Sequence, residues 1–201
     1  RRGAGARREG GSVTTTYYTA SSLDGFIATP DHSLDWLLSR DMDPDGLGSN
    51  AAFMVDVGAL LMGASTYAWL VEHAGGEAWP YAVPTWVLTH RADELAATRP
   101  EAWAEADIRF AAADDDEALR AIHVQAVAAA AALARTGVWV VGGGELAGRV
   151  ADLGLLDHVV LSYAPCTLGS GAPVLPRRLE LALRETGRNR DFVIATYDVV
   201  G

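Results

Sequence analysis

The sequence has few of the residues on which several classes of protein depend. Cys166 is the one cysteine among 201 residues, so the chain can form neither an intrachain disulfide nor a cysteine-based metal cluster. No apolar run reaches the roughly 18 residues that a membrane-spanning helix needs. From these absences we expect a cytoplasmic protein with no membrane partner and no metal site.

Basic residues are scarce as well. Lys and Arg number 16 against 26 Asp and Glu, which gives a formal net charge of −10. Residues 1–12 hold four arginines and one glutamate, or +3, so the remainder carries −13. A body this acidic repels phosphate backbones, and nucleic acid is therefore not an expected partner. The basic stretch lacks the apolar segment of a secretory signal, and we expect it to be a disordered tail. The remaining residues, 13–201, are expected to form one domain.

The most informative stretch is Val138–Leu146, which reads VWVVGGGEL. Its four apolar residues fit a strand buried on both faces, and helical sequence begins at Glu145. The three glycines between them lack a Cβ, so the backbone there can turn sharply and approach a ligand closely. Free N–H groups and the helix dipole make such a junction an anion site. We interpret it as a ligand-binding turn; a tight turn without a ligand has the same pattern.

A second junction of the same kind lies earlier in the chain. The apolar run 59–62 leads into Gly63-Ala64-Ser65-Thr66 and then into a helix expected at 67–73. The two hydroxyl residues of this turn could cap the helix or bind a phosphate. The strand expected at 85–89 ends in Thr89-His90-Arg91, polar residues at a carboxyl end, where open α/β sheets bind ligands.

Strands and helices alternate along the chain, a pattern typical of a parallel sheet with helices on both faces. The last two strands are joined through residues 187–189 and predict an antiparallel hairpin. Expected strands occupy residues 13–21, 59–62, 85–89, 108–111, 138–141, 157–164, 179–185 and 192–199, and expected helices residues 49–57, 67–73, 145–154 and a segment after 114–117. The fold class is therefore α/β, with a mainly parallel central sheet and an antiparallel C-terminal hairpin.

Two details of this pattern allow a structural test. In the helix after residues 114–117, apolar residues recur at three- and four-residue spacing from Leu119 to Leu133, and His123 beside that face is expected at the surface or its boundary. Asp24-Gly25 is a turn signal. It fits a hairpin or, given its long sequel, an irregular loop that reaches Asp35.

Four segments together resemble the dihydrofolate reductase-like superfamily, and within it the reductase domain of the bacterial riboflavin-pathway deaminase–reductases. They are Ser22–Ala28, Met62–Tyr67, Val140–Leu146 and Leu168–Gly171. No single segment is specific, but their order and spacing cover nearly the whole chain after Val13. The resemblance implies a dihydrofolate reductase-like three-layer fold. It also implies hydride transfer from NADPH to a C=N or C=O of a small heterocycle, as in 5-amino-6-(5-phosphoribosylamino)uracil reductase.

The resemblance also implies a role for each segment, with a nicotinamide dinucleotide lying along the carboxyl ends of the strands. The implied cofactor-binding residues are Ala20, Ile27, Gly63, Ala64, Ser65, Thr66, Thr89, His90, Arg91, Gly142, Gly143, Gly144, Glu145 and Leu146. The implied substrate-binding residues are Gly25, Phe26, Trp36, Gly169, Ser170 and Gly171. The candidate proton donors or relays are Asp24 and Asp35, acting through water if needed. A turn aspartate and a helix-cap aspartate explain those two equally well.

Two departures from the family pattern bear on the ligands. Many relatives have a basic residue at the position of Ala64, where it meets the adenosine 2′-phosphate. Arg91 could replace it, so NADPH is the expected cofactor and NADH the alternative. The riboflavin-pathway reductases tend to have a basic residue at the position of Phe26, which suits a phosphosugar.

The segment Asp24–Trp36 contains three aspartates and neither Lys nor Arg, which disfavours an anionic substrate. Phe26 and Trp36 offer flat apolar faces instead. We therefore expect a neutral or cationic ring, such as a pterin or a pyrimidine, near Asp24 and Trp36. Trp36 could instead serve only to pack the first helix onto the sheet.

Two alternatives remain open. Residues 142–147 formally fit the G-x-G-x-x-A fingerprint of a classical dinucleotide fold, but they lie late in the chain, and no acidic residue follows at about position 162. A non-catalytic nucleotide- or pterin-binding module would keep the fold and the glycines and lose hydride transfer.

The final expected strand is apolar on both faces. Val193, Ala195, Tyr197 and Val199 alternate with Phe192, Ile194 and Thr196. One face can cover the core of the domain while the other needs a partner, and relatives are often dimers. We therefore expect a homodimer formed through the C-terminal strands.

Overall fold

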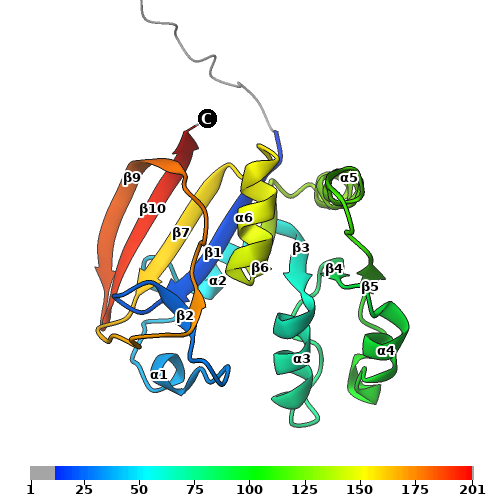
Figure 1. Cartoon of the computed structure of the whole chain (residues 1–201), viewed down its shortest axis with the longest axis horizontal. Coiled ribbons are helices and arrows are strands. Elements are labelled where there is room, and N and C mark those ends of the chain that lie inside the picture. Colours follow the sequence, from blue (N-terminus) through cyan, green and yellow to red (C-terminus); the bar gives the residue numbers. More distant parts are fainter. Residues whose placement is uncertain (1–11, 201) are drawn as a thin grey trace, which may run out of the picture.

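A computed structural model describes residues 12–200, so the expected tail at residues 1–12 lies outside the described residues except for Ser12. An eight-stranded sheet forms the centre of the molecule (Figure 1). Its order is β5 (Ile108–Ala111), β4 (Thr85–Leu88), β3 (Val57–Gly63), β6 (Gly137–Gly142), β1 (Thr14–Ser21), β7 (His158–Tyr163), β10 (Phe192–Val200) and β9 (Glu180–Asn189). The first six pair in parallel, and β10 pairs antiparallel with β7 and β9. The expected fold class is confirmed.

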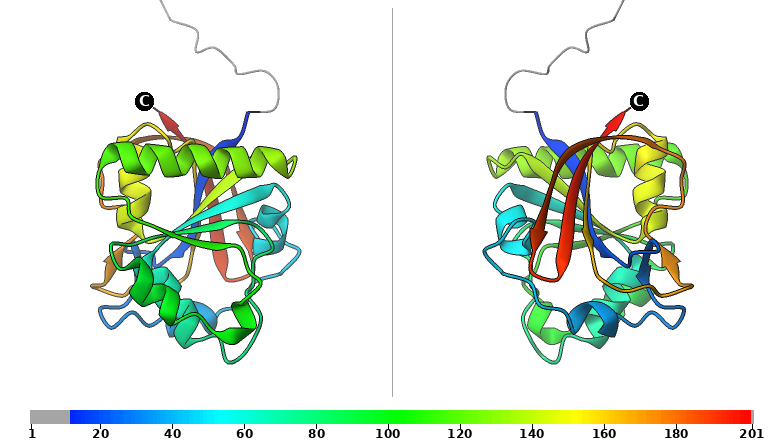
Figure 2. Two further views of the ribbon diagram at one scale, coloured as in Figure 1. Left: turned by 90° about the vertical axis from the view of Figure 1, so that its right-hand side faces the viewer. Right: turned by 90° about the vertical axis from the view of Figure 1, so that its left-hand side faces the viewer.

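Helices cover both faces of this sheet (Figure 2). One face carries α5 (Asp116–Ala132) and α6 (Gly144–Asp152), and the other carries α1 (Asp35–Leu38), α2 (Asn50–Met54), α3 (Ala64–Glu72), α4 (Ala92–Ala97) and the 3-10 turn η1 (Glu101–Trp103). Successive residues of one strand point into different cores, one on each face of the sheet. Leu61 packs with α5 and α6, whereas Leu60 packs with α3 and α4.

The central strands are apolar on both sides because both faces are covered. Every residue of β3 from Val57 to Met62 is buried, as are Val138, Trp139 and Val140 of β6. Continuous apolar runs of this kind are characteristic of a doubly covered parallel strand. The same burial sets the ends of these strands firmly in place, and the site residues come directly after those ends.

Aromatic packing fixes the position of α3. Tyr67 is fully buried, and its ring meets the edges of Trp103 at 6.0 Å and Phe110 at 5.1 Å between centroids. Edge-to-face pairs of this geometry add to the energy of area burial. The first turn of α3, which carries Ser65 and Thr66, is therefore held rigidly against the sheet.

Short elements inside predicted loops were not anticipated from the sequence. β2 (Phe26–Ala28) pairs antiparallel with β8 (Ala172–Pro173) in a separate two-stranded sheet. At Asp24-Gly25 the chain makes a tight turn, in which Gly25 has φ +87 and donates its N–H to the Ser22 carbonyl at 3.1 Å. The expected irregular loop is therefore wrong at its start. Strands of two or three residues leave no periodic pattern to detect.

The C-terminal hairpin turns two residues later than expected. Residues 187–189 belong to β9, and the reversal occurs at Arg190-Asp191. Asn189 explains the shift because its side chain is buried and held in the strand. It accepts the Asp43 N–H at 2.8 Å and donates to the Leu47 carbonyl at 2.9 Å.

His123 lies deeper than its sequence position suggested. It is 8% exposed, and its Nε2 lies 2.7 Å from Thr15 Oγ1 on β1. Asp157 accepts the Thr15 N–H at 2.8 Å on the same side. The expectation of a surface or boundary histidine is therefore wrong. Burial lowers the pKa of His123, although the charge of Asp157 opposes that shift.

Membrane-spanning helices and clustered metal ligands are both absent from residues 12–200. Within this range, no helix has the length and apolar character needed to cross a membrane. The same range contains no group of three or more His, Cys, Asp or Glu placed to hold a metal ion.

The buried histidine predicts a pH dependence of stability. An unfolded His123 takes up its proton near pH 6.5, while the folded one does so at lower pH, so the unfolded chain binds more protons between those values. Stability should therefore fall as the pH drops below about 6.5. We expect His123→Gln to lose less thermal stability between pH 7.5 and 5.5 than the parent. The exposed His73→Gln should behave like the parent. An equal loss in parent and His123→Gln would assign the titration to another group.

Candidate functional site

The six parallel strands all end at one edge of the sheet, toward the bottom of Figure 1. Most of the predicted site residues come directly after those ends. They lie in 22–25 after β1, 63–66 at the end of β3, 89–91 after β4, 142–144 at the end of β6 and 164–171 after β7. Parallel pairing therefore gathers segments from the whole chain at one edge, where open α/β sheets bind ligands.

The two glycine turns touch each other. A Cβ built on Gly63 would lie 3.6 Å from the Gly142 carbonyl oxygen, and one on Gly142 would lie 3.6 Å from Thr66 Oγ1. Gly142 has φ +149, a conformation that favours glycine, and the Gly142–Gly143 peptide bond is cis. Backbone atoms rather than side chains thus form the surface between the turns.

Both turns lead into helices whose N-termini have no side-chain cap. Gly63 is the N-cap of α3 and Gly143 that of α6, and neither helix has a side-chain cap hydrogen bond. Their first N–H groups are therefore left for another acceptor. Two helix dipoles converge on adjoining backbone, and this suits a ligand with two linked phosphate groups.

The apolar side chain of Ile27 lies next to the second glycine turn. A Cβ on Gly143 would lie 3.8 Å from Ile27 Cδ1, so β2 brings Ile27 against this turn. Ala20 precedes the last residue of β1 and pairs with Ser162 of β7. Both implied nicotinamide contacts, Ala20 and Ile27, thus lie at the edge where the glycines lie.

Three residues beside the triple glycine have clear structural roles. A Cβ on Gly144 would lie 2.6 Å from the Val174 carbonyl oxygen, so close packing requires glycine there. Leu146 is buried in the core under α6. The carboxylate of Glu145 pairs with Arg177 at 3.0 Å. Packing and ion pairing explain these three residues without a ligand.

The polar residues after β4 are held by neighbours on the surface. Thr89 is buried, and its hydroxyl accepts the Arg91 N–H at 3.0 Å. The Arg91 guanidinium lies 3.1 Å from Glu94, and His90 lies 2.5 Å from Asp114. The Arg91–Glu94 ion pair is exposed, and exposed pairs contribute little energy, so Arg91 can exchange its partner for a ligand phosphate.

Asp24 joins the first turn to the loop after β7. Its carboxylate accepts Ser22 Oγ at 2.6 Å, the Gly169 N–H at 2.7 Å and the Leu168 N–H at 3.0 Å. Hydrogen bonds from Ser22 and from these backbone amides lower the pKa of Asp24 to about 2. Asp24 is thus an anion at neutral pH. It can orient a water molecule, but it holds no proton to donate.

Other candidate substrate-binding residues lie in β2 and in the loop that leads to β8. Phe26 of β2 pairs with Pro173 of β8, and a Cβ on Gly171 would collide with the Ala28 carbonyl oxygen, so the two segments are tightly joined. Ser170 is exposed beside them.

α1 supplies the remaining two candidates. Asp35 is the exposed first residue of the helix. Trp36 packs against Phe192 and Ile194, while its indole N–H is buried without a partner. Arg40 donates to the Trp36 carbonyl at 3.2 Å, which brings one cation near the acidic segment.

Sequence reasoning missed Ser162 and Arg177. Ser162 sits in an apolar strand, is 2% exposed, and its hydroxyl has no partner. A polar residue inside the run His158–Tyr163 was the available signal. Arg177 pairs with Glu145 and Asp152 and so ties the loop after β8 to α6, a contact that no local pattern announces.

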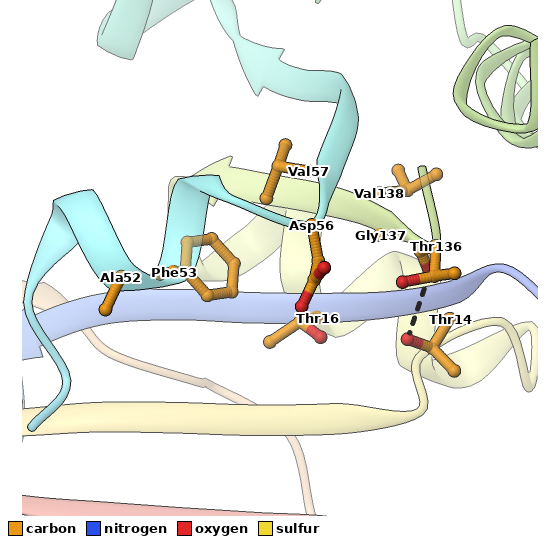
Figure 3. A pocket seen from close by; sticks show the side chains of 9 residues that line it. All are labelled: Thr14, Thr16, Ala52, Phe53, Asp56, Val57, Thr136, Gly137 and Val138. Atoms are coloured by element: carbon orange, nitrogen blue, oxygen red, sulfur yellow. Dashed lines mark hydrogen bonds between the residues drawn. The ribbon is translucent and has the colours of Figure 1, made fainter. Parts of the chain in front are cut away.

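Two hollows lie away from the glycine edge. A cavity of about 200 Å³ opens at the amino ends of β1, β3 and β6, where Thr14, Thr16, Phe53 and Asp56 line it (Figure 3). A second, of about 300 Å³, lies beside Trp79 at the start of β5. Neither contains any of the predicted site residues.

Comparison with known proteins identifies a family and relatives of this chain. Residues 13–187 match a family described as the RibD C-terminal domain. An uncharacterized protein of Bacillus subtilis, YwjB, is 26% identical over 175 residues, covering 86% of this chain and 90% of that protein.

Two solved structures share the fold. A Shewanella sp. PV-4 protein named for riboflavin biosynthesis has a TM-score of 0.73 at 23% identity, covering 94% of this chain and 100% of that one. The diaminohydroxyphosphoribosylaminopyrimidine deaminase/5-amino-6-(5-phosphoribosylamino)uracil reductase of Thermotoga maritima has a TM-score of 0.61 at 15% identity, covering 94% of this chain and 57% of that one.

The Asp24 anchor predicts a local loss of order. In Asp24→Asn the Leu168 and Gly169 amides lose a charged acceptor, so we expect their hydrogen exchange to speed up at neutral pH. Because the folded pKa of Asp24 is lowered from 3.8, the anchor should be complete above that pH and be lost as the pH falls through about 2. The exposed Asp35→Asn is the control. Unchanged exchange at both amides in Asp24→Asn would contradict this role.

Proposed function

The chain belongs to the RibD C-terminal domain family, and from this premise we propose that it is an NAD(P)H-dependent reductase of a small heterocyclic substrate. The observation that carries the proposal is the pair of adjoining glycine turns, Gly63 and Gly142–Gly143, each leading into a helix without a side-chain cap. Such paired N-termini suit the pyrophosphate of a dinucleotide.

The residues present fit such a cofactor. A Cβ built on Gly63 or Gly143 would be in ordinary van der Waals contact with its neighbours, at 3.6 Å and 3.8 Å, so neither glycine is required by protein packing. Thr66 would add a hydroxyl to the phosphate contacts, and Ala20 with Ile27 would flank the nicotinamide. A bound nicotinamide cofactor supplies the hydride, and the protein has to orient it against an electrophilic C=N or C=O.

The proton needs a separate source. Asp24 is ionised at neutral pH, because its folded pKa is lowered to about 2. We therefore assign to Asp24 the orientation of a water molecule that delivers the proton, with Asp35 as the second candidate relay. The substrate would lie against Phe26 and Trp36 and beside the Gly169–Gly171 loop.

The substrate class follows from charge and shape. Asp24, Asp31 and Asp35 surround the region with negative charge, and Arg40 is the one cation that joins the segment by a described hydrogen bond. The negative charge of a phosphosugar would not be compensated there, so such a substrate is disfavoured. We propose a neutral or cationic planar ring, of the pterin or pyrimidine type.

One observation favours a second candidate function. All the described contacts of the Asp24 carboxylate go to protein donors, so the best-placed acid serves to fasten a loop. A non-catalytic nucleotide- or pterin-binding module would need no proton donor and would have this same geometry.

We further propose that two copies associate through β9 and β10. β9 is an edge strand of the sheet, and an edge strand invites pairing with another chain. Leu183 is 60% exposed and lies opposite Tyr197 in register, while Val193 is 54% exposed. Burial of these apolar side chains would stabilise a dimer.

The cofactor site predicts the effect of a methyl group in the second glycine turn. Gly143 has extended backbone that any residue adopts, so Gly143→Ala should fold. We expect it to weaken NADPH binding by about 2 kcal/mol, roughly 30-fold, in a titration followed by nicotinamide fluorescence. Gly144→Ala is the matched variant. Its Cβ would meet the Val174 carbonyl, so it should lower thermal stability without ligand. Parental NADPH affinity in folded Gly143→Ala would overturn the placement.

Cofactor choice predicts a difference between NADPH and NADH. If Arg91 binds the 2′-phosphate, Arg91→Ala should weaken NADPH by about tenfold or more and leave NADH unchanged, since a hydrogen bond to a charged group contributes roughly 1.5–3 kcal/mol. Glu94→Gln, which removes the charge that now pairs with Arg91, should not weaken NADPH. Equal losses for both cofactors in Arg91→Ala would refute this role.

The dimer proposal predicts a mass of twice 21.2 kDa by light scattering at micromolar concentration. Leu183→Glu places a charge on the exposed apolar edge and should shift the mass toward the monomer. Val124→Glu, on an exposed valine of α5, should leave the mass unchanged. A monomeric mass for the parent protein would refute the dimer.

A further inference from the structure

Two buried polar atoms without partners lie on the same face of the sheet. They are the Ser162 hydroxyl on β7 and the Trp36 indole N–H on α1. Ser162 is 2% exposed. Buried donors and acceptors are nearly always paired in folded proteins, so two unpaired groups of complementary chemistry call for a physical reason.

Strand register places these two groups on a common side. Val159 and Leu161 of β7 point into the core under α5 and α6, so Ser162 points to the opposite face. On that face lies the cluster of Ala164, Phe192 and Ile194, against which Trp36 packs. Ser162 pairs directly with Ile194 of β10, which ties it to this cluster.

The surroundings offer neither group a protein partner. Neither atom has a hydrogen-bond partner among the described residues, and the apolar side chains on this face include Ala164, Phe192 and Ile194. Leaving a hydroxyl and an indole N–H unpaired there costs folding free energy, and substitution by an apolar group of similar shape would remove that cost. A ligand that supplies the missing partners would also remove it.

The location distinguishes this pair from the other unpaired buried atoms of the described residues. Those are the Tyr17 and Tyr67 hydroxyls and the Trp79 N–H. Tyr67 and Trp79 belong to the aromatic cluster beneath α3, and Tyr17 lies in the core under α5 and α6. Only Ser162 pairs with Ala20, the residue expected beside the reactive ring of the cofactor.

We propose that Ser162 and Trp36 form hydrogen bonds with the edge of the heterocyclic substrate. The Trp36 N–H donates to a carbonyl oxygen or ring nitrogen, and the Ser162 hydroxyl bonds the adjacent N–H or carbonyl. The ligand class is a planar nitrogen heterocycle with a carbonyl next to a ring N–H, as in pyrimidinones and pterins. This inference rests on the proposed function and names its substrate-reading residues.

Access to the pair requires α1 to move. Both atoms are covered, and α1 is one short helix with no fully buried residue. Its described hydrophobic contacts with the sheet come from Trp36 and Leu37. The ring would therefore enter between α1 and the sheet, with Trp36 moving from a packing position to a stacking one.

The test compares two substitutions that each remove one polar group and keep the shape. Ser162→Ala deletes the hydroxyl, and Trp36→Phe keeps an aromatic ring without the N–H. Pterin and 5,6-diaminouracil serve as probes, titrated calorimetrically against the NADPH-saturated protein, and NADPH affinity is measured separately in each variant. Ser39→Ala, an exposed serine at the end of α1, is the matched control.

We expect at least one probe to bind the parent and each substitution to weaken that probe about fivefold or more, the loss of one hydrogen bond. NADPH affinity should not change, and ligand-free Ser162→Ala should be at least as thermally stable as the parent. Parental probe affinity in both variants overturns the inference. Failure of both probes to bind a parent that binds NADPH also overturns it and leaves the reductase standing. Failure of the parent to bind NADPH overturns the proposed function itself.

Discussion

The site depends on the close approach of two glycine turns at the end of the sheet. β3 and β6 pair in parallel, which brings Gly63 to within 3.6 Å of the Gly142 carbonyl, measured from a built Cβ. The helices α3 and α6 begin at these adjoining turns, so their N-termini start from neighbouring backbone. Burial of β3 and β6 on both faces holds the turns in place, so the surface that we propose for the pyrophosphate is formed by the fold itself.

A second contact, between Asp24 and the loop at Leu168-Gly169, closes the other side of the site. The residues that it joins are separated by 144 and 145 positions in the sequence. These hydrogen bonds also hold the aspartate as an anion. The same contact that fastens the loop at the proposed substrate site therefore removes Asp24 as a proton donor. A reductase would therefore take the proton that follows hydride transfer from water. A binding module would need no proton donor.

Features that depend on local pattern were predictable from the sequence. The strand–glycine–helix junctions, the parallel sheet and the C-terminal hairpin rest on periodicity and glycine placement, and all are present. Features that depend on partners distant in the chain were not predictable. The pairing of β2 with β8, the burial of His123 against Thr15 and the hydrogen bonds of Asn189 that lengthen β9 are such cases. Ser162 was missed because a lone serine in a strand becomes informative only when the structure shows that its buried hydroxyl has no hydrogen-bond partner.

The most direct test is a crystal structure of the protein with NADPH. We expect the pyrophosphate between the first turns of α3 and α6, within hydrogen-bonding distance of their backbone N–H groups, and the nicotinamide beside Ala20 and Ile27. A cofactor bound at the opposite edge of the sheet, in the cavity beside Asp56, would contradict the proposed site.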